Sequence, residues 1–330
     1  MVKHVTEFAI VADIGGTNAR FSRVKLADLS LDKVQVYPCA QFATLSDALQ
    51  HYRQQEQLMD LQDVAIAIAC PVQGDLVQMT NFHWRFSIRQ VQADLELNTF
   101  LVMNDFTAVA MCLPALSSSE CIQLGQGQVQ SSAPMAVLGA GTGLGVGHLL
   151  PVGPEQYLPL PGEGGHVDWA PTNAQEWFIH QYLAERYGHV SPERLLSGPG
   201  LEDLYQALAA YQNINVTAVS AADISQHALN GTDPLAEQTI AQFLASLGSV
   251  AGNLALTLST LGGVYIGGGI VPKLLPLLKN SEFRNRFEQK GRFTRFNADI
   301  ATFVITAAQP GLTGAGMYLK QTIYSQPRGE

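Results

Sequence analysis

Charged residues are scarce in this sequence, and basic residues are scarcer than acidic ones. Only 14% of the 330 residues are charged, and 28 acidic against 19 basic side chains leave a formal net charge of -9. An acidic protein without a basic patch repels phosphate backbones. The composition therefore argues against nucleic acid as a partner.

Cysteine is also rare. The four cysteines, Cys39, Cys70, Cys112 and Cys121, are widely scattered. They form no C-x-x-C motif and no Cys/His spacing suited to zinc, so a disulfide framework or a structural metal site has little support. We expect four ordinary buried thiols.

Signals for export and for membrane insertion are weak. The stretch "MVKHVTEFAIVADIGG" has an acidic residue where a secretory signal needs an apolar core. Residues 238–272 carry no charge and are numerous enough to cross a membrane, but polar residues recur among them and the stretch breaks at "LGGVYIGGGIVP". We expect a buried helix followed by a buried strand, no membrane partner and a cytoplasmic location.

The familiar nucleotide-binding signatures are missing. The sequence has no Gly-Lys dipeptide, which excludes the G-x-x-x-x-G-K-[ST] loop. It also lacks the G-x-G-x-x-G fingerprint and the H-R-D catalytic loop of protein kinases. A nucleotide would need a different phosphate-binding architecture.

Apolar residues, in contrast, are plentiful. They make up 47% of the chain, whose length exceeds that of a usual single domain, so two domains are expected. Nearly continuous apolar strands indicate sheets that are covered on both faces. The first half shows a helical pattern at 46–55 and strand patterns at 6–16, 19–26, 33–40, 63–72 and 99–104.

The second half repeats part of this organisation. The stretch "MAVLGAGTGLGVGHLL", residues 135–150, again reads as strand, Gly-rich turn and strand, like residues 8–24. The repetition suggests two related halves. Helical patterns follow at about 200–212, 219–230 and 234–259, with an earlier helix whose capping box would be Thr172 and Gln175. Mixed strands and helices make the fold class α/β.

Two Gly-rich turns are candidate phosphate sites. Each follows a strand, and glycine lets main-chain N–H groups approach a phosphate without obstruction from Cβ. A tight hairpin needs glycine for steric reasons alone, which is the simpler explanation of either turn by itself. The residues are Asp13, Gly15, Gly16, Thr17 and Asn18 in the first turn and Gly141, Thr142 and Gly143 in the second.

The stretch "LVMNDFTAVA" places Asn104 and Asp105 between an apolar run and the start of a helical pattern. Asp105 can be an ionised helix N-cap, which the residues alone favour. It can also be a general base that accepts a hydroxyl proton during phosphoryl transfer. The two roles are compatible.

Seven motifs resemble those of one family, in the same order and along nearly the whole chain. They are "DIGGTNAR", "NDFTAVA", "GAGTGLG", "LPGEGGHVDWAP", "ERLLSGPGL", "GGVYIGGGIVPK" and "PGLTGAG". With them the sequence resembles the bacterial ATP-dependent glucokinases, in the group without a zinc motif. The Cys-rich zinc run of the repressor/open-reading-frame/kinase sugar kinases has no counterpart, and no room for a DNA-binding helix-turn-helix precedes "FAIVADIGG".

The resemblance implies the hexokinase/actin-like (ribonuclease H-like) fold, with two α/β domains and a cleft between them. The smaller domain would comprise residues 1–110 plus about 300–330, and the larger one residues 111–299. Hinge closure would then exclude water from the reacting groups.

The resemblance also assigns sugar-binding roles. Asp105 would be the catalytic base, and Asn104 would hold a sugar hydroxyl. Glu163, His166 and Glu193 match the family's sugar-contacting positions, and carboxylates and amides suit a ligand covered with hydroxyls. Each has a simpler explanation when taken singly, because a lone histidine is usually structural and Glu193 can support a helix start.

On the nucleotide side, Mg²⁺ would arrive with ATP and keep several waters, one of them held by Asp13, and no metal would be bound by the protein directly. The two Gly-rich turns would meet the phosphates. Residues 267–273, with Gly268 and Gly269, would place a helix start near the adenosine. Tight packing of a strand-to-helix turn is the alternative explanation.

The function that this resemblance implies is glucokinase activity. The γ-phosphoryl of ATP would pass to the 6-hydroxyl of D-glucose, giving glucose 6-phosphate and ADP in the first step of glycolysis. A kinase of fructose or mannose is one alternative, and a sugar sensor without catalysis is another, which would not need Asp105 as a base. A homodimer is also implied.

Overall fold

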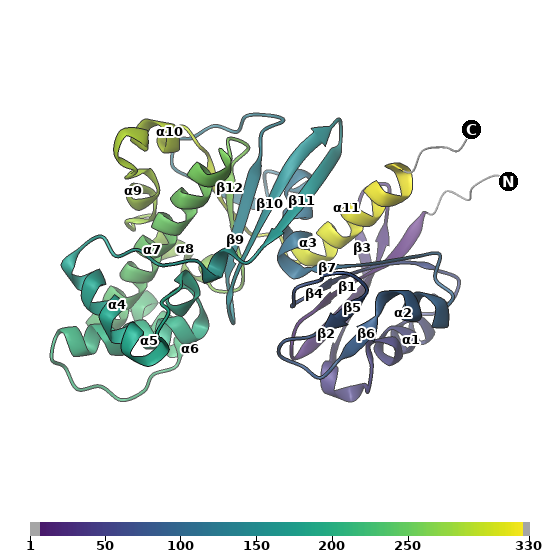
Figure 1. Cartoon of the computed structure of the whole chain (residues 1–330), viewed down its shortest axis with the longest axis horizontal. Helices are drawn as coiled ribbons and strands as arrows, with labels where there is room; N and C mark the ends of the chain where they lie inside the picture. The colour runs from purple at the N-terminus through teal and green to yellow at the C-terminus, as the bar shows by residue number, and fades with distance from the viewer. Residues whose placement is uncertain (1–6, 326–330) are drawn as a thin grey trace. The chain divides into compact units, whose positions relative to one another are not determined.

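The computed structural model describes residues 7–325 and groups the chain into two compact units (Figure 1). The first unit contains the chain up to Ser117, Gly153–Pro161 and the chain from Ala307 on, and the second contains Ser118–Val152 and Gly162–Thr306. The domain boundaries expected near residues 110 and 300 stay a prediction. That prediction placed residues 153–161 in the larger domain, whereas the structure groups them with the first unit. Residues 1–6 and 326–330, which the predicted smaller domain includes, lie outside the described part of the chain. The first residue of the strand expected at 6–16 lies outside it as well.

The first unit is built on a five-stranded sheet with the order β3-β2-β1-β4-β7. Strands β1, β2 and β3 form an antiparallel meander, while β4 is parallel to both β1 and β7. The strand bounds are Phe8–Ile14 (β1), Asn18–Lys25 (β2), Leu31–Pro38 (β3), Asp63–Ile68 (β4) and Thr99–Asn104 (β7). Every residue of β4 is buried, as its continuous apolar sequence predicted.

Alternate residues of β1 pack into two different cores, because successive side chains of a strand point to opposite faces. Ile10 and Ala12 pack with residues of α1, whereas Ala9 and Val11 pack with residues of α11. The sheet is therefore covered on both faces. The remaining elements of this unit are α1 (Leu45–Gln55), β5 (Leu76–Gln78), β6 (Arg85–Ser87), α2 (Ile88–Asp94), α3 (Asp105–Cys112) and α11 (Pro310–Ser325).

The parallel register brings the carboxyl ends of three strands to one edge of this sheet. Ile14 of β1 pairs with Ile68 of β4, which in turn pairs with Asn104 of β7. Asp13 and Asp105 therefore lie at the same edge, the position at which parallel sheets bind ligands.

The second unit contains strands in the order β10-β9-β12-β13-β8. Here β10 is antiparallel to β9, and β12 is parallel to both β9 and β13. This repeats the arrangement of β2, β1, β4 and β7, so the two related halves read from the sequence are confirmed. The bounds are Cys121–Leu124 (β8), Met135–Ala140 (β9), Leu144–Gly153 (β10), Val264–Gly267 (β12) and Thr302–Ile305 (β13), and β11 (Gln156–Gly162) follows β10 in the chain.

The long apolar helix α7 (Pro234–Leu258) is the central helix of the second unit. It is long and apolar enough to span a membrane, but 72% of its most apolar window is buried inside the protein. It is followed by the buried strand β12, as predicted from residues 238–272. The other helices are α4 (Ala174–Tyr187), α5 (Gly198–Tyr211), α6 (Ala221–Asn230), α8 (Leu275–Leu278), α9 (Phe283–Glu288) and α10 (Thr294–Ala298).

The start of α4 is capped one residue later than the expected capping box. The N-cap is Asn173, whose side chain accepts from the N–H of Glu176, and Glu176 accepts from the N–H of Thr172 at 2.7 Å. Gln175 instead donates to the Gln242 side chain on α7. The expectation of Thr172 with Gln175 is therefore wrong, because a tertiary contact takes Gln175.

Candidate active site

Asn104, and not Asp105, is the N-cap of α3. Its Oδ1 accepts from the N–H groups of Phe106 at 2.9 Å and Thr107 at 3.2 Å. Asp105 is the first residue of the helix, and its Oδ1 accepts from the N–H of Phe106 at 2.9 Å. The cap interpretation of Asp105 is wrong, because its neighbour already satisfies the exposed donors of the first turn.

The Asp105 carboxylate binds a proton more readily than that of an ordinary aspartate, because its pKa is raised. Burial, and in second place the negative charge of Asp13, raise its pKa to about 6, against the opposing effect of the Phe106 N–H. Burial also raises the pKa of Asp13, which the nearby Arg20 opposes. A carboxylate with a pKa near the working pH suits a general base.

Asp13 lies between a cation and a helix N-terminus. It faces Arg20 across the β1–β2 ladder, with Arg20 Nη1 at 3.8 Å from Asp13 Oδ2. A Cβ on Gly311 would come within 2.9 Å of the same oxygen, so glycine at this position lets α11 start close to the Asp13 carboxyl. The sequence interpretation missed Arg20, although the spacing of a tight hairpin places it opposite Asp13.

The first Gly-rich turn is held by hydrogen bonds from two directions. Within the turn, the N–H of Gly15 donates to the carbonyl of Asn18 at 3.0 Å. From outside, the N–H of Cys39 donates to the carbonyl of Thr17 at 2.8 Å, and the Cys39 thiol lies 3.5 Å from the carbonyl oxygen of Gly15. The turn is therefore fixed before any ligand arrives.

The second Gly-rich turn is built into the second unit in a similar way. The N–H of Gly141 donates to the carbonyl of Gly143, and the carbonyl of Gly141 accepts from the N–H of Gly198 at the start of α5, both at 2.8 Å. Glu193 Oε2 accepts from the N–H of Leu144 at 2.9 Å. A Cβ on Gly143 would meet that oxygen at 2.5 Å, so a side chain at this position would displace the Glu193 carboxylate from the turn.

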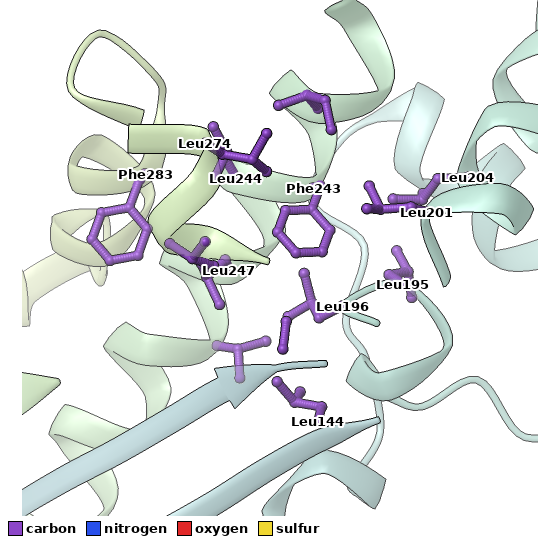
Figure 2. Close-up of a cluster of buried hydrophobic side chains, with 14 of the residues drawn as sticks. Leu144, Leu195, Leu196, Leu201, Leu204, Phe243, Leu244, Leu247, Leu274 and Phe283 are labelled. Atoms are coloured by element: carbon purple, nitrogen blue, oxygen red, sulfur yellow. The ribbon is translucent and has the colours of Figure 1, made fainter. Parts of the chain in front are cut away.

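Apolar packing fixes the main chain on both sides of the hydrogen bond between Leu144 and Glu193. Leu144 follows the turn directly, and Leu195 and Leu196 follow Glu193 in the chain. Figure 2 shows these three side chains in one buried cluster. Burial of such side chains restricts the main chain on each side, so Glu193 is held against the second turn.

His166 and Glu193 are brought together, and Glu163 lies on the same short loop as His166. Nδ1 of His166 is 3.9 Å from Oε1 of Glu193, and the His166 N–H donates to the carbonyl of Glu163 at 3.0 Å. The Glu163 side chain is exposed. His189, which the sequence interpretation missed, contacts the carbonyl of His166 at 3.0 Å through Nε2.

The turn at 267–269 lies against the end of β9. Gly268 has a φ of +81°, and a Cβ there would meet the carbonyl oxygen of Ala140 at 2.3 Å. The N–H of Ile270 donates to the same oxygen at 3.3 Å. A short 3₁₀ helix, Val271–Leu274, begins immediately afterwards. Gly268 and Gly269 therefore neighbour the second Gly-rich turn.

The four cysteines differ in how deeply they are buried. Three of the four cysteines are buried while Cys121 is half-buried, so the expectation of four buried thiols is wrong for Cys121. Within residues 7–325, no group of three His, Cys, Asp or Glu side chains is arranged to hold a metal ion.

Comparison with known proteins identifies the family. The glucokinase family model matches residues 10–322. The chain belongs to the glucokinase family. It is 45% identical to the glucokinase of Colwellia psychrerythraea over 318 residues, covering 94% of this chain and 96% of that protein. It is also 45% identical to the glucokinase of Pectobacterium atrosepticum over 321 residues, covering 97% of this chain and 99% of that protein.

Solved structures of glucokinases have the same fold. The crystal structure of a glucokinase from an Antarctic psychrotroph matches with a TM-score of 0.87 at 34% identity, covering 95% of this chain and 98% of that one. The glucokinase of Balamuthia mandrillaris in complex with glucose, at 21% identity, matches with a TM-score of 0.76 over 97% of this chain and 95% of that one. The predicted α/β fold of the hexokinase/actin-like type is confirmed, and the chain is an ATP-dependent hexose kinase.

A first prediction concerns Glu193. Gln at this position keeps an oxygen for the Leu144 N–H but replaces the second carboxylate oxygen, which would accept from a sugar hydroxyl, by an N–H donor. We expect Glu193→Gln to raise the KM for glucose by about 10-fold to 100-fold, with the KM for ATP changed by less than about twofold. Steady-state kinetics with each substrate varied in turn will measure both constants.

Glu193→Ala is the matched comparison, because it loses the Leu144 contact as well and should raise both KM values. If Glu193→Gln weakened both substrates equally, Glu193 would be a support of the turn and would not bind sugar.

Proposed function

We propose that this glucokinase transfers the γ-phosphoryl of ATP to the 6-hydroxyl of D-glucose, with Asp105 as the general base. The observation that supports the base assignment is a half-buried carboxyl at the carboxyl end of parallel strands, with a pKa raised to about 6. At neutral pH such a group is mostly ionised, yet it accepts a proton more readily than an ordinary aspartate.

The proposed reaction moves one proton and one phosphoryl group. The 6-hydroxyl proton passes to Asp105 while the hydroxyl oxygen forms a bond to the γ-phosphorus. The bond from that phosphorus to the oxygen bridging it to the β-phosphate breaks, and ADP leaves with the electron pair. The protein's part is to position and to stabilise charge, because phosphoryl transfer needs little covalent help.

Mg²⁺ is proposed to enter with ATP, where it neutralises charge on the phosphates. Asp13 fits the role of holding one of its waters, since it is a half-buried carboxyl with a like-charged neighbour and one arginine 3.8 Å away. The remaining proposed ATP-binding residues are Gly15, Gly16, Thr17 and Asn18, Gly141, Thr142 and Gly143, and Gly268 and Gly269.

The proposed sugar-binding residues are Asn104, Glu163, His166 and Glu193. The Oδ1 of Asn104 already accepts two main-chain N–H groups, and its Nδ2 lies 3.4 Å from the carbonyl of Cys70. A sugar hydroxyl would therefore be bound through the amide N–H groups of Asn104.

A coupled assay of ATP consumption over a panel of hexoses tests the proposed substrate. We expect glucose to give the highest kcat/KM. Preference for fructose or mannose would support the alternative hexose kinase, and binding of glucose without ATP turnover would support a sensor.

The pH dependence of activity should report the base. Protonation below the pKa removes the acceptor, so log kcat/KM should fall on the acid side with an apparent pKa of about 6. Asp13→Asn should shift this acid-side fall in log kcat/KM to lower pH, because it removes a negative charge that raises the pKa of Asp105. Rates of glucose phosphorylation measured at constant ionic strength from about pH 5 to pH 8 will show this fall. A flat profile over this range would contradict the assignment.

We also propose a cytoplasmic homodimer, on the family resemblance alone. Sedimentation equilibrium at several protein concentrations will measure the oligomeric state.

A further inference from the structure

The loop at residues 79–84, here called the Asn81 loop, joins β5 to β6 in the first unit. The N–H of Met79 donates to the carbonyl of Trp84 at 3.1 Å, which closes the loop. Trp84 is only 2% exposed, and its Nε1 donates to the carbonyl of Phe42 at 3.2 Å. His83 Nε2 lies 3.3 Å from the carbonyl of Ala43. The loop is therefore anchored to the core at one end.

The Asn81 loop contacts the first Gly-rich turn. A Cβ on Gly16 would lie 3.1 Å from the Cβ of Asn81 and 3.4 Å from its carbonyl oxygen. Asn81 thus lies directly against Gly16, and a Cβ at residue 16 would be in tight contact with it. The residue itself is exposed, and within residues 7–325 its amide makes no hydrogen bond.

An unengaged amide beside this turn has a defined chemical use. Asparagine presents two N–H donors and carries no charge, so it can bind phosphoryl oxygens without a new ion pair. The nearby carboxyls Asp13 and Asp105 repel such oxygens, and the cation of Arg20 lies close to Asp13. Because the loop is anchored, its main chain also loses little freedom when the donor binds.

We propose that Asn81 is a further substrate-binding residue, whose amide donates to the phosphoryl oxygens of ATP at the first Gly-rich turn. This rests on the proposed function, in which that turn holds the phosphates.

Asn81→Asp is the decisive variant, because it keeps the shape of the side chain and replaces two donors by a negative charge. We expect it to weaken binding of a non-hydrolysable ATP analogue by about 100-fold, and Asn81→Ala by about 10-fold. Glucose affinity and the melting temperature should stay close to those of the wild type, since Asn81 is exposed. Calorimetric titration of each ligand measures both affinities.

Gln78→Glu is the matched control. It adds the same charge to an exposed residue of β5, three positions before Asn81 and outside the loop. Binding of the analogue by Asn81→Asp as tight as by Gln78→Glu would overturn the role of Asn81. Equal loss of glucose and analogue would also overturn it, because that pattern indicates packing. A wild-type protein that binds no analogue would contradict the proposed function itself.

Discussion

Replacing Asp105 with asparagine is expected to lower kcat by a factor of about 10² to 10⁴, while the protein still folds and binds glucose. The amide of asparagine has no useful proton affinity, so it cannot accept the hydroxyl proton. Stopped-flow or coupled assays of glucose phosphorylation will give kcat, and a direct titration will give the glucose affinity.

The local structure makes this substitution a clean test. Asn104 caps the helix, so Asp105→Asn leaves the cap in place. The new amide oxygen can still accept from the N–H of Phe106, as Oδ1 of Asp105 does. A role confined to the helix start would therefore tolerate the change at small cost.

Stability provides a second readout for the same variant. The folded state raises the pKa of Asp105 to about 6, so it disfavours the ionised form that prevails at neutral pH. Stability is consequently lost as the pH rises from the unfolded value through the folded pKa. Asp105→Asn removes this cost, and its melting temperature at pH 7 should equal or exceed that of the wild type. Normal turnover in such a folded variant would remove the base assignment.

Much of the fold was predictable because its strongest signals are local. Continuous apolar runs at 63–72 and 99–104 became β4 and β7, and the uncharged stretch 238–272 became a buried helix and strand. The two strand, Gly-rich turn and strand units predicted two related sheets, because each unit must bury the same kind of face.

The parts that were missed depend on tertiary contacts. Either Asn104 or Asp105 can cap a helix by its chemistry, and only the backbone of the folded chain selects Asn104. Cys39 is hydrogen-bonded to the first Gly-rich turn and Asn81 lies against it, each from 21 or more positions away, so no local pattern indicates them. The roles of Glu163, His166 and Glu193 came from family resemblance, and those roles stay a prediction.

The other large expected effect is on stability and concerns a buried ion pair in the second unit. Glu176 of α4 is fully buried, and its carboxylate accepts from Arg286 Nη1 at 2.7 Å and Gln242 Nε2 at 2.9 Å. Burial works to raise the pKa of Glu176, but the hydrogen bonds from Arg286, Gln242 and Thr172 together lower it below the ordinary value. The carboxylate is therefore ionised in the interior because its partners compensate the charge.

Arg286→Met should lower the free energy of unfolding at pH 7 by about 3 to 5 kcal/mol, because it leaves the carboxylate of Glu176 buried without a cation. Urea denaturation followed by circular dichroism will measure the loss. Arg292→Met, at an exposed residue of the same unit, is the control and should change stability by less than about 0.5 kcal/mol.

The sign of the pH effect separates lost charge compensation from lost packing. In the wild type, the lowered pKa of Glu176 contributes stability above the unfolded pKa, and that contribution is lost as the pH falls through the folded pKa. Without Arg286 the pKa of Glu176 should rise, so the carboxyl becomes neutral in mild acid and the difference between variant and wild type should shrink there. Adding Glu176→Gln to Arg286→Met removes the uncompensated charge, and the double variant should recover part of the stability at pH 7. A double variant as unstable as Arg286→Met alone, with a pH-independent loss, would show that the arginine acts through packing and that the charge of Glu176 needs no partner.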